Sequence, residues 1–282
     1  MNVQWYPGHM TKAKRQMQED IKLVDAVIEL LDARCPLSSR NPDIDVLAKG
    51  KVRIVLLNKA DLSDDNCNKK WSAYFQNLGI RVMCLDSKNK GSVKNVVSLI
   101  RESCKEKIER DIRKGIKNTV IRAMVVGIPN VGKSTFINSV SGKSAAKTGN
   151  KPGVTKGKQW ISISKDLNLL DTPGILWPKF DDEEVGKNLA YIGSINDDIL
   201  PVEDLSFEFA GFMKNRYCDN LEKRYGISVS EETEKLEILN MIAESRNCYR
   251  KGTDIDYHKT ADIILDDFRN GRLGKITLEI PS

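Results

Sequence analysis

The sequence predicts an α/β domain followed by a smaller, all-helical domain. Three observations support this prediction. The chain has 282 residues, enough for one domain of about 150 residues and a companion. Short, continuously apolar runs alternate with helical stretches over the first two thirds, which is typical of parallel strands buried on both faces. Beyond Phe180 only helical periodicity remains. We therefore expect domains at 1–180 and 181–282.

The elements of the first domain follow one another in a regular alternation. A helix is expected over 10–23. Strands are then predicted, in chain order, over 26–31, 54–57, 80–85, 122–126, 159–163 and 167–170. Helices are expected over 71–78 and 92–114 and directly after the glycine-rich segment 127–135. In the second domain, helices are predicted over 183–193, 203–217, 231–247 and 256–270, and an alternating segment, 275–280, closes the chain.

The composition excludes several classes of protein. Hydrophobic residues make up 40% and charged residues 30%, which is ordinary for a globular protein with a sizeable core. No apolar run approaches the ~18 residues of a membrane span, and residues 1–10 contain no signal-peptide core, so we expect a cytoplasmic protein without a membrane partner. The six cysteines lack Cys-x-x-Cys spacing and only two histidines accompany them, which favours reduced thiols over a metal site.

The charge of the chain is unevenly distributed. Residues 181–282 hold 13 Lys/Arg and 22 Asp/Glu, a net charge of −9, whereas residues 1–180 have a net charge of +15. The end of the predicted helix 92–114 is rich in basic residues interleaved with three acids. A solvated helix face with ion pairs and a contact with RNA both remain open for it. Its basic residues are Lys105, Lys107, Arg110, Arg113, Lys114 and Lys117.

Residues 127–134, Gly-Ile-Pro-Asn-Val-Gly-Lys-Ser, fit the phosphate-loop pattern G-x-x-x-x-G-K-[ST] in full. The glycines let the backbone curl so that its N–H groups point at phosphate oxygens, and the following helix presents its positive end to the same charge. Lys133 should reach the β- and γ-phosphates and act in catalysis, and the Ser134 hydroxyl should ligate Mg²⁺. The predicted nucleotide contacts here are Asn130, Val131, Gly132, Lys133, Ser134 and Thr135.

A second phosphate-directed motif follows about 40 residues later. Asp171-Thr172-Pro173-Gly174 ends a predicted strand, where Asp171 is a candidate for a second metal-directed carboxylate and the Gly174 N–H for a sensor of the γ-phosphate. Between the two motifs lies a lysine-rich segment, 143–158, without an acid. We expect its Thr155 to close over the metal.

The base is indicated by a third motif. Asn58-Lys59-Ala60-Asp61 follows a predicted buried strand and resembles the [NT]KxD motif of the GTPase superfamily, in which the aspartate accepts hydrogen bonds from guanine N1 and its exocyclic amine. Adenine lacks this donor pair. Ser87, in Asp86-Ser87-Lys88, is in the place of the superfamily's last guanine-contacting loop.

The motifs run in the order base motif, last loop, phosphate loop, Thr155 and Asp171, whereas ordinary GTPases place the first two last. Ligand loops of an open α/β sheet gather at the carboxyl ends of its strands, so a circular permutation changes the order without moving the site. With residues 5–10 (Trp-Tyr-Pro-Gly-His-Met) and 32–36 (Asp-Ala-Arg-Cys-Pro), this order resembles the circularly permuted GTPases of ribosome biogenesis, above all those that assist late assembly of the large subunit.

The resemblance implies a GTPase with GTP/GDP and Mg²⁺, stimulated by a precursor of the large ribosomal subunit and its rRNA, with no small-molecule substrate besides GTP and water. Ile175 occupies the slot where many small GTPases carry the glutamine that orients the attacking water. His9, to which the resemblance points, is the candidate for that role. Asn130 at its loop position implies a possible K⁺ ion, because related GTPases use one there.

Two other functions stay open at this point: a phosphate-loop phosphotransferase acting on a small molecule, and an RNA-binding protein that uses nucleotide structurally. For RNA, the basic first domain is favoured over the acidic second one. Local basic groups are the exception in the second domain; they are Arg246, Arg250, Lys251, Arg269, Arg272 and Lys275. The chain after Gly174 runs through Trp177 and Pro178 into the helical domain, so nucleotide state could move that domain.

Overall fold

The computed structural model describes residues 15–142, 159–174, 176, 182–251 and 254–281. These residues form two compact units. The first holds the described residues up to Val185 and also those from Thr277 onward, and the second holds those of Gly186–Ile276. The two units therefore meet along the chain between Val185 and Gly186, and again between Ile276 and Thr277.

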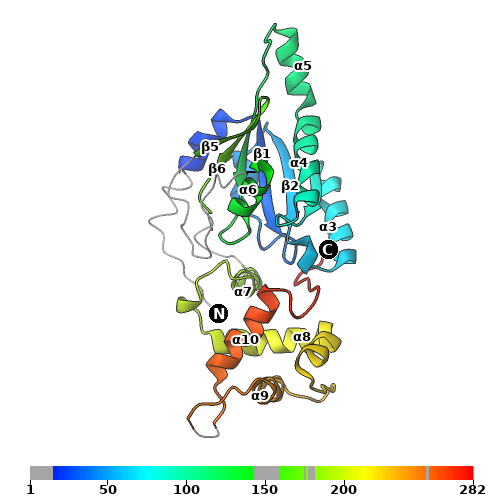
Figure 1. The fold of residues 1–282 in the computed structure, drawn as a ribbon, viewed down its shortest axis with the longest axis vertical. Coiled ribbons are helices and arrows are strands. Elements are labelled where there is room, and N and C mark those ends of the chain that lie inside the picture. The colour runs from blue at the N-terminus through cyan, green and yellow to red at the C-terminus, as the bar shows by residue number, and fades with distance from the viewer. Residues whose placement is uncertain (1–14, 143–158, 175, 177–181, 252–253, 282) are drawn as a thin grey trace. The chain divides into compact units, whose positions relative to one another are not determined.

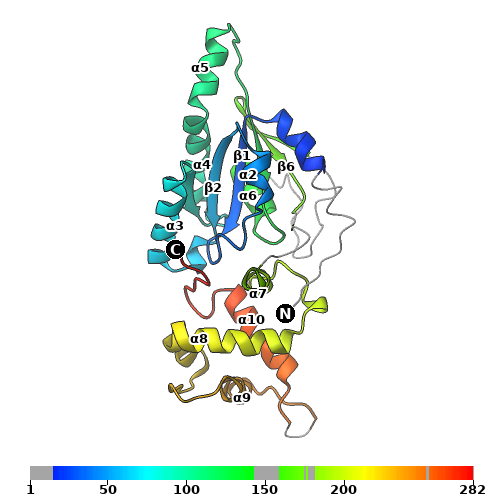
Figure 2. The ribbon, with the colours of Figure 1, turned by 180° about the vertical axis from the view of Figure 1, so that it is seen from behind.

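The first unit is built on a six-stranded sheet (Figures 1 and 2). Its strand order is β3-β2-β1-β4-β6-β5. All neighbours are parallel except β5 and β6. All six predicted strands are present, with bounds that differ by a few residues: β1 Ala26–Asp32, β2 Val52–Asn58, β3 Arg81–Leu85, β4 Ile121–Val126, β5 Gln159–Ser164 and β6 Leu167–Asp171.

Apolar strands and amphipathic helices make the core of this unit. Every residue of β1 is buried, as a strand covered on both faces requires. Residues 15–20 are helical and lead into η1 Ile21–Leu23, α2 spans Asp43–Leu47, η2 Ala60–Leu62, α3 Asp65–Asn77 and α6 Lys133–Ser141. Helix α3 begins after Asp64, whose side chain accepts hydrogen bonds from two backbone N–H groups, and it buries Trp71 and Phe75 in the core.

The predicted helix 92–114 is two helices, α4 Lys90–Ser103 and α5 Lys105–Arg113, separated at Cys104. Helix α4 buries Val93, Val96 and Ile100. Helix α5 has no buried residue and extends past the end of the sheet (Figures 1 and 2). It therefore contributes little to the core.

The second unit is helical, as predicted. It contains the end of α7 Glu183–Tyr191, η3 Asp197–Ile199, α8 Val202–Tyr225, α9 Lys235–Ser245 and α10 Tyr257–Arg269. The ring of Phe209 lies at the centre of its core, with centroids 5.0 Å from Tyr191 and 4.9 Å from Phe268. No described helix is long and apolar enough to cross a membrane.

The residues after Thr277 attach to the first unit by backbone and side-chain hydrogen bonds. The Leu278 N–H donates to the Arg34 carbonyl at 2.7 Å. Trp71 Nε1 donates to the Glu279 carbonyl at 3.1 Å. The Glu279 carboxylate accepts from the N–H of Leu37 and from both the N–H and the hydroxyl of Ser38. The alternating segment 275–280 thus holds the loop after β1 and forms no strand.

Candidate nucleotide site

The predicted site residues lie at one edge of the sheet. Asp32, Asn58 and Asp171 end β1, β2 and β6, and the phosphate loop follows β4. Since β1, β2, β3, β4 and β6 are all parallel, these positions share the carboxyl edge. From β1 the chain proceeds outward to β2 and β3 and then returns to β4 on the other side of β1, which makes the β1/β4 junction the switch point at which such sheets bind ligands.

Steric restrictions explain the glycines of the phosphate loop. A Cβ atom at Gly127 would lie 2.6 Å from the Leu30 carbonyl oxygen of β1. Gly132 has φ +101°, and a Cβ atom there would lie 2.5 Å from Asn58 Nδ2. The first glycine therefore lets the loop pass close to β1, and the second lets it pass close to the base motif. Helix α6 begins directly after Gly132, so its amino-terminal end faces the loop.

Lys133 is the buried cation of this loop, with 8% of its surface exposed. Its Nζ donates to the carbonyls of Gly127 and Ile128, at 2.9 and 3.0 Å. Burial lowers the pKa of Lys133 to about 8, against the opposing attraction of Asp171. The ammonium group thus lies against the backbone of the loop, and from this position it can neutralise the charge of phosphate oxygens.

Asp171 and Gly174 lie beside this lysine. One carboxylate oxygen of Asp171, Oδ1, is buried and accepts no hydrogen bond from the residues that the structure describes. Burial raises the pKa of Asp171, while Lys133 lowers it. A Cβ atom at Gly174 would lie 2.9 Å from Lys133 Nζ, so the Asp-Thr-Pro-Gly motif contacts the phosphate loop closely at its glycine. A buried oxygen without a donor is the expected state of a carboxylate that serves a cation.

The base motif is joined to the phosphate loop by its first two residues. Asn58 Nδ2 donates to the Val131 carbonyl at 2.7 Å, and Asn58 Oδ1 accepts from the N–H and hydroxyl of Ser87 at 3.0 and 2.7 Å. Lys59 Nζ donates to the Asn130 carbonyl at 2.9 Å. Asn58 is 2% exposed and therefore serves as a structural bridge among the three loops.

Asp61, in contrast, is exposed, as a residue that reads a bound base should be. Partial burial and the neighbouring Asp86 raise the pKa of its carboxyl group. Ser134 and Thr135 are half-buried at the start of α6. Three residues singled out by the sequence, His9, Thr155 and Ile175, lie outside the described residues, and so do Trp177 and Pro178.

Comparison with known proteins identifies the family. Residues 122–243 match the family model for 50S ribosome-binding GTPases. Ribosome biogenesis GTPase A of Bacillus cereus is 47% identical over 281 residues, which is 100% of this chain and 95% of that protein. The chain belongs to the ribosome biogenesis GTPase A family. As a member of this family it is a GTPase with the permuted α/β fold and helical carboxy-terminal part that its motifs predict.

Solved structures agree with this family assignment. The crystal structure of GNP-bound YlqF from T. maritima superimposes on this protein with a TM-score of 0.66 and a sequence identity of 26%. The match covers 96% of this chain and 99% of the YlqF chain. A GDP-bound structure of the same protein covers 95% and 99% with a TM-score of 0.67. These two YlqF structures contain a bound nucleotide, GNP in the first and GDP in the second.

The Asp32-Ala33-Arg34 segment lies at the site, although no role there follows from its sequence. Asp32 is fully buried and accepts two hydrogen bonds from the Arg34 guanidinium, at 2.9 and 2.8 Å. The Arg34 N–H also donates to Asp32 Oδ1, at 3.1 Å, and Lys59 Nζ lies 3.0 Å from Oδ2. Burial would raise the pKa of Asp32, but Arg34 and Lys59 outweigh it and hold this pKa well below its usual range. A charged pair, Asp32 and Arg34, at the end of a mainly apolar strand is the signal that could have drawn attention to it.

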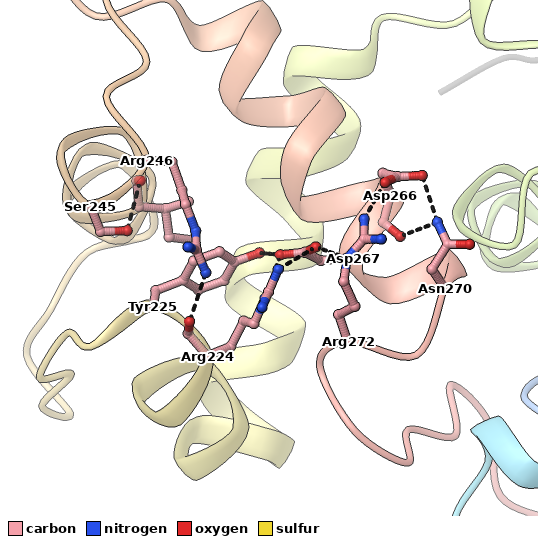
Figure 3. Close-up of polar contacts among 9 residues, drawn as sticks. Arg224, Tyr225, Ser245, Arg246, Asp266, Asp267, Asn270 and Arg272 are labelled. Carbon is pink, nitrogen blue, oxygen red and sulfur yellow. Dashed lines mark hydrogen bonds and ion pairs between the residues drawn. The ribbon is translucent and has the colours of Figure 1, made fainter.

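Several arginines of the helical unit that the sequence offers for RNA are engaged inside that unit. Asp267 accepts hydrogen bonds from Arg224 at 2.8 and 2.9 Å, from Tyr225 at 3.0 Å, and from Arg272 (Figure 3). Burial alone would raise the pKa of Asp267, but these donors keep it lowered. Arg246 lies over the Tyr225 ring and donates to the Arg224 carbonyl (Figure 3).

Arg269, another of these residues, donates to Asp197 and to the carbonyls of Ala190 and Tyr191. Its guanidinium joins α10 to η3 and to the end of α7 within the unit. The contacts of Arg269 and of the arginines around Asp267 thus stabilise the fold of this unit. Arg246, Arg269 and Arg272, three of the six basic groups that the sequence offers here, are therefore engaged within the unit.

Proposed function

We propose that this GTPase binds a precursor of the large ribosomal subunit and its rRNA and promotes a late step of its assembly in the cytoplasm. The observation that carries the proposal is family membership over the full chain, because the Bacillus cereus relative is named for ribosome biogenesis. The connected phosphate and base motifs support a nucleotide switch within this function.

We propose Mg²⁺ as the metal of the site, held by Ser134, Asp171 and Thr155. The unpartnered buried Oδ1 of Asp171 fits such an ion, since hard cations take carboxylate and hydroxyl oxygens. When bound, the ion would neutralise charge on the β- and γ-phosphates. Lys133 would supply a second positive charge to the same phosphates, and the Gly174 N–H would donate a hydrogen bond to the γ-phosphate. Asn130 is the residue proposed to hold K⁺; equal hydrolysis in Na⁺ and K⁺ buffers would exclude that ion.

Helix α5 and the turn after it are the surface that we propose for rRNA. Four of its exposed basic side chains, called here the α5 surface, are Arg110, Arg113, Lys114 and Lys117. Ile112 and Ile116 beside them are 62% and 45% exposed, so core packing does not account for this helix. Lys107, by contrast, is tied to Asp111 at 3.0 Å and to the Val120 carbonyl at 2.6 Å. We therefore propose the ion-paired helix face for Lys107 and the contact with RNA for the α5 surface.

Co-sedimentation with purified large subunits in a non-hydrolysable GTP analogue tests this proposal. The triple variant Arg110→Glu, Arg113→Glu, Lys114→Glu should bind the subunits and protein-free large-subunit rRNA more weakly. Its plot of log affinity against log salt should be shallower by roughly one unit for each lysine or arginine that no longer binds a phosphate. Lys69→Glu with Lys70→Glu, exposed on α3, is the matched control and should bind like wild type.

The outcomes separate the alternatives. Weaker binding of the α5 variant to subunits but not to free rRNA would assign the surface to a ribosomal protein. If the wild type binds subunits equally well with a GTP analogue, with GDP and without nucleotide, the result would favour an RNA-binding protein that uses nucleotide only structurally. Absence of binding to subunits would contradict the proposed function.

A further inference from the structure

The ammonium group of Lys59 connects three segments at the carboxyl edge of the sheet. It lies 3.0 Å from Asp32 Oδ2 at the end of β1 and 2.9 Å from the Asn130 carbonyl of the phosphate loop. Its own backbone is in the left-handed region, at φ 59° and ψ 33°, between β2 and η2. Such a conformation is uncommon for lysine, so the contacts of its side chain must help to hold it.

Asp32 is placed more firmly than the lysine that it holds. Its exposure is zero, Arg34 binds both of its oxygens, and its backbone N–H donates to Ser39 Oγ at 3.0 Å. The next residue, Ala33, donates its N–H to the Asn58 carbonyl at 2.8 Å. Lys59 is itself 24% exposed at its side chain. The fixed partner is therefore the aspartate, and the movable one is the lysine of the base motif.

We propose that Asp32 is a positioning residue for guanine nucleotide recognition, which acts through Lys59 by holding its ammonium group between β1 and the phosphate loop. Without this anion, the partner of the Lys59 ammonium group among the described residues would be one neutral carbonyl, that of Asn130. Charge-assisted hydrogen bonds are about twice as strong as neutral ones. Asp61 follows Lys59 by two residues, so the same anchor fixes the start of the turn that presents the base-reading carboxylate.

The surroundings of Asp32 favour a role through Lys59 over a purely structural one. Arg34 alone already satisfies both carboxylate oxygens, and it is buried to 1% exposure with them. The additional cation would not be needed to compensate the buried charge. A buried carboxylate with two cations is instead suited to keep one of them in a fixed place while a ligand comes and goes.

A double-mutant cycle on Asp32 and Lys59 tests this inference, which rests on the nucleotide site proposed above. The affinity of a fluorescent GDP analogue and the KM and kcat for GTP are measured for Asp32→Asn, Lys59→Met and the double variant. We expect each single variant to lower GDP affinity about tenfold or more. The double variant should bind GDP no more weakly than Lys59→Met does. In the kinetic measurements KM should rise while kcat changes less than twofold, because neither residue contacts the γ-phosphate-sensing motif.

Asp166→Asn is the matched control, since Asp166 also accepts two hydrogen bonds from one arginine, Arg101, but precedes β6 at the opposite edge of the sheet. If Asp32→Asn alone does not fold because Arg34 loses its partner, the same cycle is measured in an Arg34→Met background.

Two results would overturn the inference: unchanged GDP affinity of Asp32→Asn, or losses that multiply in the double variant. Unchanged affinity of Lys59→Met would instead contradict the assignment of the base motif itself.

Discussion

Lys133→Ala should lower GTP and GDP affinity by about thirtyfold to several thousandfold, because truncating one partner of a buried, hydrogen-bonded charge pair costs about 2–5 kcal/mol. Lys133 is almost fully buried under the phosphate loop, where its ammonium group donates to the carbonyls of Gly127 and Ile128. Isothermal titration with both nucleotides measures the loss. Lys94→Ala, an exposed lysine of α4, is the control and should bind normally.

The same residue gives GTP binding a dependence on pH. In the nucleotide-free protein, burial lowers the pKa of Lys133 to about 8, so the group is mostly neutral at pH 9. Phosphates favour the charged form, so binding above pH 8 must take up a proton, and affinity falls by at most about tenfold per pH unit. Relative to Lys133→Ala, wild-type affinity should therefore decline between pH 7 and pH 9. An equal pH dependence of the two proteins would contradict the assignment.

This pKa also has a consequence for the stability of the nucleotide-free protein. The folded-state pKa lies below the unfolded one, so folding disfavours the charged lysine. The free energy of unfolding is therefore lowered by the full amount below pH 8, and it increases as pH rises from 8 toward the ordinary lysine pKa of 10.5.

Asp61→Asn should change the base that the protein selects. We expect the carboxylate to accept two hydrogen bonds from guanine, and hydrogen bonds to charged groups contribute about 1.5–3 kcal/mol each, so GTP affinity should fall by a hundredfold or more. Xanthine carries a carbonyl oxygen where guanine has its amine, and the asparagine amide can donate to it. The variant should therefore prefer xanthosine triphosphate to GTP.

Competition of GTP and of xanthosine triphosphate against a fluorescent GDP analogue measures the ratio of the two affinities in the variant and in wild type. Asp65→Asn, an exposed carboxylate at the start of α3, is the nearby control and should keep the preference for GTP. A GTP affinity of Asp61→Asn within twofold of wild type would show that another residue reads the base.

The strands and the phosphate and base motifs could be predicted from the sequence because each depends on neighbouring residues. Apolar runs mark the buried strands, and the rule that parallel strands carry their ligand loops at one edge brings together Asn58, Gly127 and Asp171 from three distant stretches of chain. The contact of Asn58 with the Val131 carbonyl is the direct outcome of that rule.

Features that depend on single long-range contacts could not be predicted in this way. The attachment of Glu279 to the Ser38 backbone joins residues 241 apart and leaves no periodic pattern. The separation of α4 from α5 at Cys104 interrupts a continuous helical pattern. Arg246 and Arg272 look like free basic groups in the sequence, and only the fold reveals the carbonyl, ring and carboxylates that engage them.

The most direct test of the central claim is GTP hydrolysis measured with and without purified large ribosomal subunits, in wild type and in His9→Ala. Subunits should stimulate the wild type at least about tenfold, and His9→Ala should lose this stimulation while its GTP affinity stays near wild type, because misplacing a reactant by about 1 Å can cost about 10²-fold in rate. Absence of stimulation in wild type would contradict a subunit-dependent GTPase switch, and full stimulation of His9→Ala would exclude His9 as the residue that orients the water.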